Sequence, residues 1–330
     1  MTATKLRPSS AGAGGNIKYT VAAETWRFIA YIFFWSMCAF AILFTKFYTS
    51  ALLAEGPTAY GLPEGDQCGP FGRSGWDGLE AGQGFEFGTQ SHLQMLFGFK
   101  NICANWDYSP SREFTAMVYP LFEYSLLVYL ILDFWTTQLA NNRGELNAWF
   151  WKFSQAAFVI NIILAAQFRM IFVCIAYENV RAHTAGFLGL QVCLILVAAH
   201  NSLFLIDTDV SYEFLGGIKN TRTAIKAYLI GLLAISSIKV TATTYVVMHG
   251  VGAPWTLEPS FLPGKAVGQV VDLVWMLFNA VAPLFISYFR SHREIPIVIE
   301  ISTSAPTYID SAGEYETLKK SGGNNYESTL

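Results

Sequence analysis

Long apolar runs alternate with polar segments along most of the sequence. Each run is close to the ~20 residues that an α-helix needs to cross the hydrocarbon core of a bilayer. The pattern therefore predicts an all-α, polytopic membrane protein with six transmembrane helices. We expect these spans at about Phe28–Thr45, Phe114–Ala140, Phe153–Tyr177, Thr184–Ile206, Ala227–Val247 and Val267–Phe289.

The polar segments divide the chain into a membrane domain and two tails. Residues 1–25 are expected to form a disordered cytoplasmic tail, and residues 26–290 the six-helix membrane domain. Inside that domain, residues 47–113 form a long, Gly-rich loop between the first two spans. Loops of this length are seldom structureless, so we expect it to cap the outer end of the helices. Residues 291–330 predict a second cytoplasmic tail, largely disordered, with a short extended piece at 295–301.

The composition agrees with a membrane protein and argues against a nucleic-acid partner. The 330 residues are 53% hydrophobic and 14% charged, whereas soluble domains average about 25% charged residues. The net charge is −3, and no basic block stands out. Residues 1–15 lack the apolar core of a signal peptide, so we expect the first span to serve as its own insertion signal.

Lysine and arginine are distributed unevenly between the two sides of the predicted spans. The N-terminal segment up to Arg27 holds four of these residues, the turns at 141–152 and 207–226 hold two and three, and the exit of the sixth span holds Arg290 and Arg293. The short turns on the other side contain only Arg181 and Lys265. Because positive residues favour the cytoplasmic side, both termini are predicted to be cytoplasmic. The 47–113 loop then faces outward or into a lumen, in an integral protein of the plasma membrane or an endomembrane.

Four of the charged residues inside the predicted spans lie in the half nearer the long loop. The helical rise of about 1.5 Å per residue places Glu123 and Arg169 at similar depths, about 6 Å from the middle of the membrane. Sequential spans usually pack together, so we predict an ion pair between these two residues. Lys239 and Asp272 lie about 3 Å and 9 Å outward and form a second predicted pair.

Other polar residues in the spans allow two interpretations. Asp133 and His200 lie nearer the cytoplasmic side, while Asn161 and Gln167 add uncharged polar groups to the third span. In the first interpretation, all these side chains hold the helices in register as neutralised pairs. In the second, they line a water-filled path or a solute pocket, which is the usual use of ionisable groups inside a membrane.

Our first hypothesis is a non-enzymatic membrane protein that binds or passes an ion or a small polar solute. A scaffold or accessory subunit with purely structural ion pairs is the alternative. A membrane-embedded enzyme acting on lipid is a third, and it would require His200 and Asp133 to lie together. The candidate site contains Glu123, Arg169, Lys239, Asp272, His200, Asp133, Asn161 and Gln167.

Two cysteines, Cys68 and Cys103, lie in the long loop, and the other three lie in spans. The predicted outer side is oxidising, so we expect a disulfide between Cys68 and Cys103. A cysteine inside a span is expected to behave as a small hydrophobic residue.

The remaining motifs do not indicate a cofactor or a metal. The string Gly-Arg-Ser-Gly at 72–75 matches intramembrane serine proteases, but it lies in a loop without a paired histidine. The five histidines show no HExxH or i,i+4 spacing, which argues against a metal site. A retinal Schiff base on Lys239 would require seven spans with the lysine in the last one, and here the lysine lies in the fifth of six.

The C-terminal tail contains two short recognition patterns. Ser328-Thr329-Leu330 has the hydroxyl and apolar end that PDZ grooves bind by strand addition. Tyr315 and Leu318 have the spacing of a tyrosine sorting signal, and both patterns are typical of eukaryotic proteins. The expected partners are therefore the lipid bilayer, an adaptor at this tail, and a second copy of the chain.

Overall fold

The computed structural model describes residues 17–72, 80–97, 101–208, 218–249, 264–291 and 296–301. They belong to two compact units, a helical bundle within residues 22–295 and a small sheet formed by segments near the two termini.

Six helices in the described residues are long and apolar enough to cross a membrane, which confirms the all-α, six-span prediction. This is the architecture of an integral, multi-pass membrane protein. The first span is α1 (Ala23–Phe44), continued by the π-helical turn η1 (Thr45–Thr49) and by α2 (Ser50–Glu55). The others are α5 (Ser111–Asn142), α6 (Ala148–Gln167) with the short α7 (Met170–Val173), α8 (Val180–Asp207), α9 (Ile218–His249), and α11 (Gly264–Met276) continued by the π-helical turn η6 (Leu277–Val281) and α12 (Ala282–Ser291).

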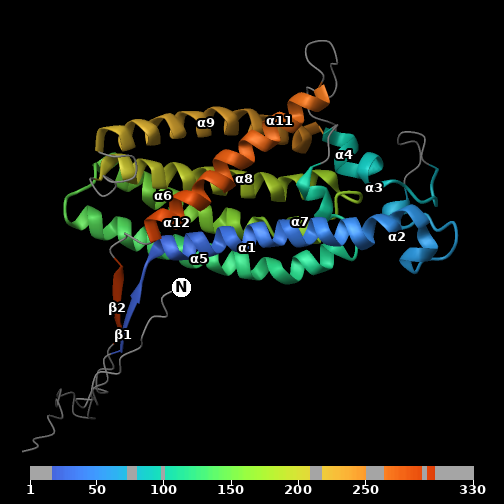
Figure 1. Ribbon diagram of the computed structural model, residues 1–330, viewed down its shortest axis with the longest axis horizontal. Helices are drawn as coiled ribbons and strands as arrows, with labels where there is room; N and C mark the ends of the chain where they lie inside the picture. Colours follow the sequence, from blue (N-terminus) through green and yellow to red (C-terminus); the bar gives the residue numbers. More distant parts are fainter. Residues whose placement is uncertain are drawn as a thin grey trace, which may run out of the picture. The chain divides into compact units, whose positions relative to one another are not determined.

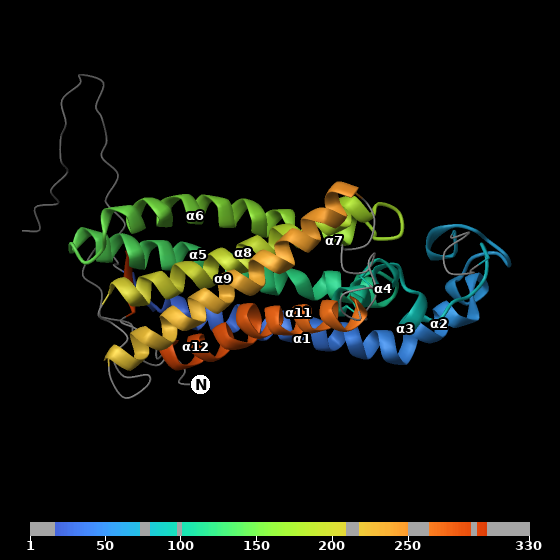
Figure 2. The ribbon, with the colours of Figure 1, turned by 90° about the horizontal axis from the view of Figure 1, so that it is seen from above.

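Each long helix packs against the next one along the chain, and α12 completes the arrangement by packing against α1 (Figures 1 and 2). The apolar stretch of α8 is 72% buried, compared with 28–50% in the other spans, so α8 is the most enclosed helix. Its glycines permit this close packing. A Cβ atom on Gly186 would lie 3.0 Å from the Cβ of Met170, and one on Gly189 would lie 3.1 Å from the Cδ of Gln167.

The loop between the first two spans is folded where it is described. It contains η2 (Pro57–Tyr60), η3 (Gly69–Phe71), α3 (Phe87–Gln90), α4 (His92–Phe97) and η4 (Ile102–Trp106). The rings of Phe71, Phe85 and Tyr108 pack in sequence, and Tyr108 stacks on Tyr177 from the α7–α8 connection. Figure 1 shows α3 and α4 beside α2 at one end of the bundle, which we call the loop end.

The opposite end of the bundle, where α1 begins and α12 finishes, is called the termini end. Glu24 near the start of α1 forms an ion pair with Arg290 near the end of α12. Both ends of the six-helix domain therefore lie on one side, as an even number of spans requires.

The predicted disulfide between Cys68 and Cys103 was wrong, because both cysteines are free thiols. Cys68 is exposed, whereas Cys103 is buried in η4, where Asn101 Oδ1 accepts a hydrogen bond from its backbone N–H. Burial raises the pKa of the Cys103 thiol, which disfavours the thiolate that disulfide exchange requires. Burial of Cys103 in a packed 3₁₀ turn therefore outweighs the expectation that an oxidising compartment would join it to Cys68.

Part of the segment expected to be disordered is a strand. β1 (Ile17–Val21) pairs antiparallel with β2 (Ile297–Ile301), and Ile17 lies opposite Ile301. The prediction of an extended piece near 295–301 is therefore confirmed, while disorder at 17–21 was wrong. Ile17, Tyr19 and Val21 alternate with the polar Lys18 and Thr20 in β1, and Lys18 lies 3.3 Å from the Glu300 carboxylate across the pair.

Candidate functional site

The predicted Glu123–Arg169 ion pair is present. The Nε and one terminal nitrogen of Arg169 donate to the Glu123 carboxylate at 2.8 Å each, in a two-pronged arrangement. Arg169 lies in the break between α6 and α7, where Gln167 donates to the Ala185 carbonyl at 3.0 Å. The Arg169 side chain is 65% exposed and that of Glu123 is 6% exposed. The pair therefore lies at the outer surface of the bundle.

The predicted Lys239–Asp272 pair is present as well, between α9 and α11. Both side chains are largely buried, and the rings of Phe97 and Phe187 lie 5.9 and 6.0 Å from the Lys239 ammonium. Phe97 belongs to α4, so the folded loop covers this lysine.

These two ion pairs do not form one charged site. Arg169 follows α6 and Lys239 lies on α9, and α8 packs between α6 and α9 (Figure 2). In the described part of the chain, no hydrogen bond or ion pair links one pair to the other. Both predicted pairs are therefore present, but they lie on different sides of α8 and are not connected to each other.

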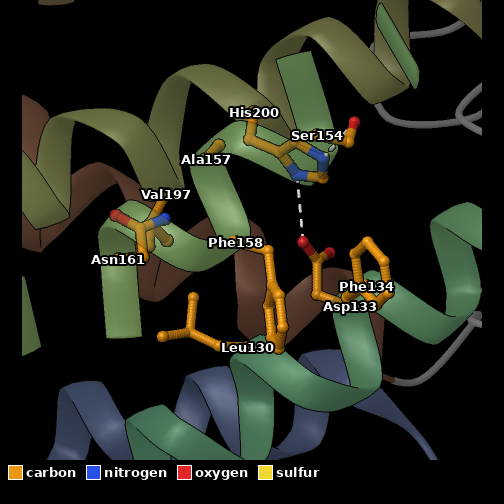
Figure 3. Close-up of a pocket in the computed structure, with 9 residues that line it drawn as sticks. All are labelled: Leu130, Asp133, Phe134, Ser154, Ala157, Phe158, Asn161, Val197 and His200. Carbon is orange, nitrogen blue, oxygen red and sulfur yellow. Dashed lines mark hydrogen bonds and ion pairs between the residues drawn. The ribbon is translucent and has the colours of Figure 1, made fainter. Parts of the chain in front are cut away.

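A different set of residues forms a connected polar site nearer the termini end, where α5, α6 and α8 meet. His200 Nδ1 lies 2.9 Å from Asp133 Oδ2, and His200 Nε2 lies 2.9 Å from Ser154 Oγ. Figure 3 shows the imidazole pointing from α8 toward the carboxylate of Asp133 on α5. Ser154 Oγ also lies 2.8 Å from the Phe150 carbonyl, one turn earlier on α6.

This arrangement satisfies His200 in both of its charge states. When the imidazole is neutral, Nδ1–H donates to Asp133 and Nε2 accepts from the Ser154 hydroxyl. When it is charged, both nitrogens donate, and the Ser154 hydroxyl turns to the Phe150 carbonyl. A proton can therefore enter or leave the site without leaving a buried polar group unsatisfied, which would otherwise cost about 1–3 kcal/mol.

The same residues line a small pocket. It also contains Asn161, Leu130 and Phe158, and its volume is about 10 Å³, which is close to the space of one water molecule. The Asn161 side chain is buried, and its Oδ1 has no hydrogen-bond partner among the described residues. The Asp133 side chain is 20% exposed, so the pocket is not sealed from the bundle surface.

The Asp133–His200–Ser154 order is also that of a hydrolytic triad. The lipid-enzyme hypothesis required Asp133 and His200 to lie together, and they do. However, Ser154 is 2% exposed, and a pocket for one water leaves no room for an acyl group beside its hydroxyl.

A second polar network near the termini end was not identified from the sequence. Glu24 forms ion pairs with Arg27 at 2.8 Å and with Arg290, and it accepts a hydrogen bond from Asn201 at 2.9 Å. Arg27 also donates to Ser287 at 2.5 Å. All five side chains are buried. Because Arg27 and Arg290 flank the predicted spans, they were interpreted as residues at the membrane surface.

One sequence signal could have revealed this network. Glu24 and Arg27 are three residues apart at the start of a helix, a spacing that places oppositely charged side chains together. Arg27 also lies over the ring of Tyr129, 5.6 Å from its centroid, one helical turn before Asp133 on α5. The arginine network and the His200 site are therefore close neighbours.

A buried acid–histidine pair also lies at the loop end. Asp107 Oδ1 lies 3.3 Å from His183 Nε2, and His183 Nδ1 lies 2.9 Å from the Cys174 carbonyl. Burial raises the pKa of Asp107 well above its ordinary value, while the nearby charge of Arg112 acts in the opposite direction. A protonated Asp107 can donate to His183 Nε2 while Nδ1–H donates to Cys174.

Several sequence features lie outside the described residues. They include positions 73–75 of the Gly-Arg-Ser-Gly string, and Tyr315, Leu318, Ser328, Thr329 and Leu330 of the C-terminal tail. Within the described part, no group of three His, Cys, Asp or Glu side chains is arranged to hold a metal ion. The fold and this site define an all-α, six-span membrane protein with a connected polar site between α5, α6 and α8. A comparison with protein-family models, curated proteins and solved structures found no match.

Proposed function

We propose that this multi-pass membrane protein transports a small ion, the proton in the first instance, alone or together with a small polar solute. The observation that carries the proposal is the hydrogen bonding of His200, because Asp133 and Ser154 accommodate both of its charge states. A group that changes charge inside the bundle at low cost is what proton movement requires.

Further support comes from a line of polar residues along α6. Ser154 and Asn161 are seven residues, or about two helical turns, apart and therefore share one face of α6. Gln167, at the end of α6, reaches α8 through its hydrogen bond to the Ala185 carbonyl. The three residues extend over about 20 Å of the helix, which is a large part of the membrane thickness. His200 bonds to Ser154, and Gly189 lies against Gln167, so α8 follows the same line. Proton or solute movement would use this line.

A flux measurement tests the proposal. The full chain would be reconstituted in vesicles containing a pH-sensitive dye, and a potassium diffusion potential would drive proton entry. His200→Gln and Asp133→Asn keep hydrogen-bonding groups but remove the ionisable ones. We expect each variant to reduce proton flux at least about tenfold, the effect of losing roughly 1.4 kcal/mol at the site.

The matched control is the double variant Glu123→Gln with Arg169→Gln, which removes a charged pair at the outer surface of the same helices. Its flux should stay near that of the unmodified protein. Retention of full flux by a well-folded His200→Gln protein would refute the proposal.

A scaffold without transport is the second candidate function. It is favoured by the observation that Glu24, Glu123, Asp133 and Asp272 all have basic partners, as structural ion pairs would. It predicts no proton flux in the unmodified protein under the same driving force.

A further inference from the structure

A second cavity, at the loop end, lies outside the site described above. Its volume is about 440 Å³, which falls within the range of roughly 300–1,000 Å³ typical of ligand pockets. It is formed where the first span meets the folded loop. Its polar walls are Thr45, Lys46 and Ser50 from the first span and Asn101 and Asn105 from the loop, and Ile42 is part of its apolar wall.

The chemistry of this cavity suits an anion. Lys46 is the only charged residue among the described residues that line it, and its ammonium group has no carboxylate partner in the described part of the chain. Thr45, Asn101 and Asn105 are buried and bring hydroxyl and amide groups to the same walls. A cation attracts the negative charge of a phosphate group, and neutral donors around it form hydrogen bonds to the phosphate oxygens.

The neighbouring surface of the first span indicates that the anion belongs to a lipid. Ile42, Leu43, Phe47 and Tyr48 are large apolar or aromatic side chains with 42–64% exposure. Aromatic residues that project outward at the end of a span are typical of the membrane–water interface. A lysine at this depth extends its ammonium group toward the lipid headgroups.

The backbone at this place departs from a regular helix. Thr45–Thr49 form a π-helical turn, and the Ser50 N–H and hydroxyl both donate to the Thr45 carbonyl, the hydroxyl at 2.7 Å. Such turns inside α-helices occur frequently at functional sites, because they change which side chains share a face. Here Thr45, Lys46 and Ser50 all line one cavity.

We propose that this cavity binds the phosphate group of an anionic phospholipid from the leaflet at the loop end. Lys46 provides the charge, the side-chain amides of Asn101 and Asn105 donate to the phosphate oxygens, and an acyl chain follows Ile42 and Leu43. The site is separate from the α5–α6–α8 site and does not depend on the proposed transport.

Native mass spectrometry of the full-length protein in detergent would test the assignment. The protein would be titrated with phosphatidylglycerol, with phosphatidylcholine, and with phosphatidylglycerol in the presence of inorganic phosphate. Lys46→Gln removes the charge, and Lys46→Arg retains it. The control is Lys152→Gln, which neutralises an exposed lysine near the start of α6, at the termini end.

We expect Lys46→Gln to weaken phosphatidylglycerol binding about fivefold, the usual effect of one lysine near an anionic lipid surface. Lys46→Arg and Lys152→Gln should bind as the unmodified protein does, and phosphatidylcholine should bind more weakly. Three outcomes would overturn the assignment: equal binding by Lys46→Gln and Lys152→Gln, equal binding of the two lipids, or displacement of the lipid by equimolar inorganic phosphate, which would indicate a site for free phosphate.

Discussion

Two buried polar groups near the termini end differ in the basic residue that each one uses. Glu24 is held by Arg27 and Arg290, whereas Asp133 is held by His200. Arginine stays charged at every accessible pH, whereas the imidazole of His200 has hydrogen-bond partners for either of its charge states. The first group is therefore a fixed element of the structure, and the second can change its charge.

The two groups are connected through consecutive residues of α8. His200 bonds to Asp133 on α5 and to Ser154 on α6, while Asn201 donates to Glu24 on α1. Because neighbouring residues on a helix face different directions, one turn of α8 contacts three other helices. The His200 site, which has partners for both charge states, is thus supported by the Glu24–Arg27–Arg290 network, in which the arginines stay charged.

The largest expected effect comes from breaking the fixed network. Glu24→Gln would leave Arg27 and Arg290 buried without their carboxylate, and removing one member of a buried ion pair typically costs about 3–5 kcal/mol. We expect a loss of stability of this size in thermal or denaturant unfolding of the purified protein in detergent.

The control for this variant is Glu145→Gln, which removes the exposed partner of Arg143. Exposed ion pairs contribute little, so its cost should stay below about 1 kcal/mol. If both variants had the same stability, the arginine network would not be the fixed element that we describe.

The pair of Asp107 and His183 extends the comparison to the loop end. The raised pKa of Asp107 means that folding favours its protonated form, so this contribution to stability is complete at pH values below about 4. It is lost as the pH rises from there through the raised pKa, by up to about 1.4 kcal/mol per pH unit. Asp107→Asn resembles the protonated acid and still donates to His183, so it should remove this dependence.

Thermal unfolding of the purified protein between pH 5 and pH 8 would measure the Asp107 effect. The control is Glu64→Gln, an exposed acid in the same loop, which should keep the pH dependence of the unmodified protein. An Asp107→Asn protein with the same pH dependence would contradict the proposed protonation of Asp107.

The smallest expected change in stability comes from Ser154→Ala. The loss of one hydroxyl typically costs about 1 kcal/mol, so the protein should remain folded. Proton flux should nevertheless fall about fivefold, because Nε2 of His200 loses the group that adapts to both of its charge states.

Ser125→Ala is the matched control for Ser154→Ala. Ser125 is a buried serine whose hydroxyl donates to the carbonyl four residues earlier, as that of Ser154 can, but no histidine bonds to it in the described structure. If both variants had the same flux, the role of Ser154 would be limited to packing.

The sequence was sufficient for the features that depend on position along one helix. Apolar length predicted the six spans, and depth along the helices predicted which acid pairs with Arg169 and which with Lys239. The depth of a residue in the membrane does not, however, show where its helix lies around the bundle. The sequence could therefore not show that α8 lies between the Glu123–Arg169 pair and the Lys239–Asp272 pair.

Other features escaped prediction because they depend on tertiary packing. Arg27 and Arg290 resembled ordinary flanking residues, and only the packing of α12 against α1 makes them buried partners of Glu24. Asp133 and His200 were recognised as candidates, but Ser154, which completes their site, looked like a common small residue on a packed helix. The predicted disulfide between Cys68 and Cys103 was wrong because Cys103 is buried within its own 3₁₀ turn.

The ion pair between Glu24 and Arg290 has a consequence for biosynthesis. Glu24 and Arg27 enter the membrane with the first span, when Arg290, 266 residues after Glu24, has not yet been made. The network can therefore close only after the sixth span has been inserted. Until then the first span contains an incomplete polar group, so closure of this network marks a chain whose insertion is finished.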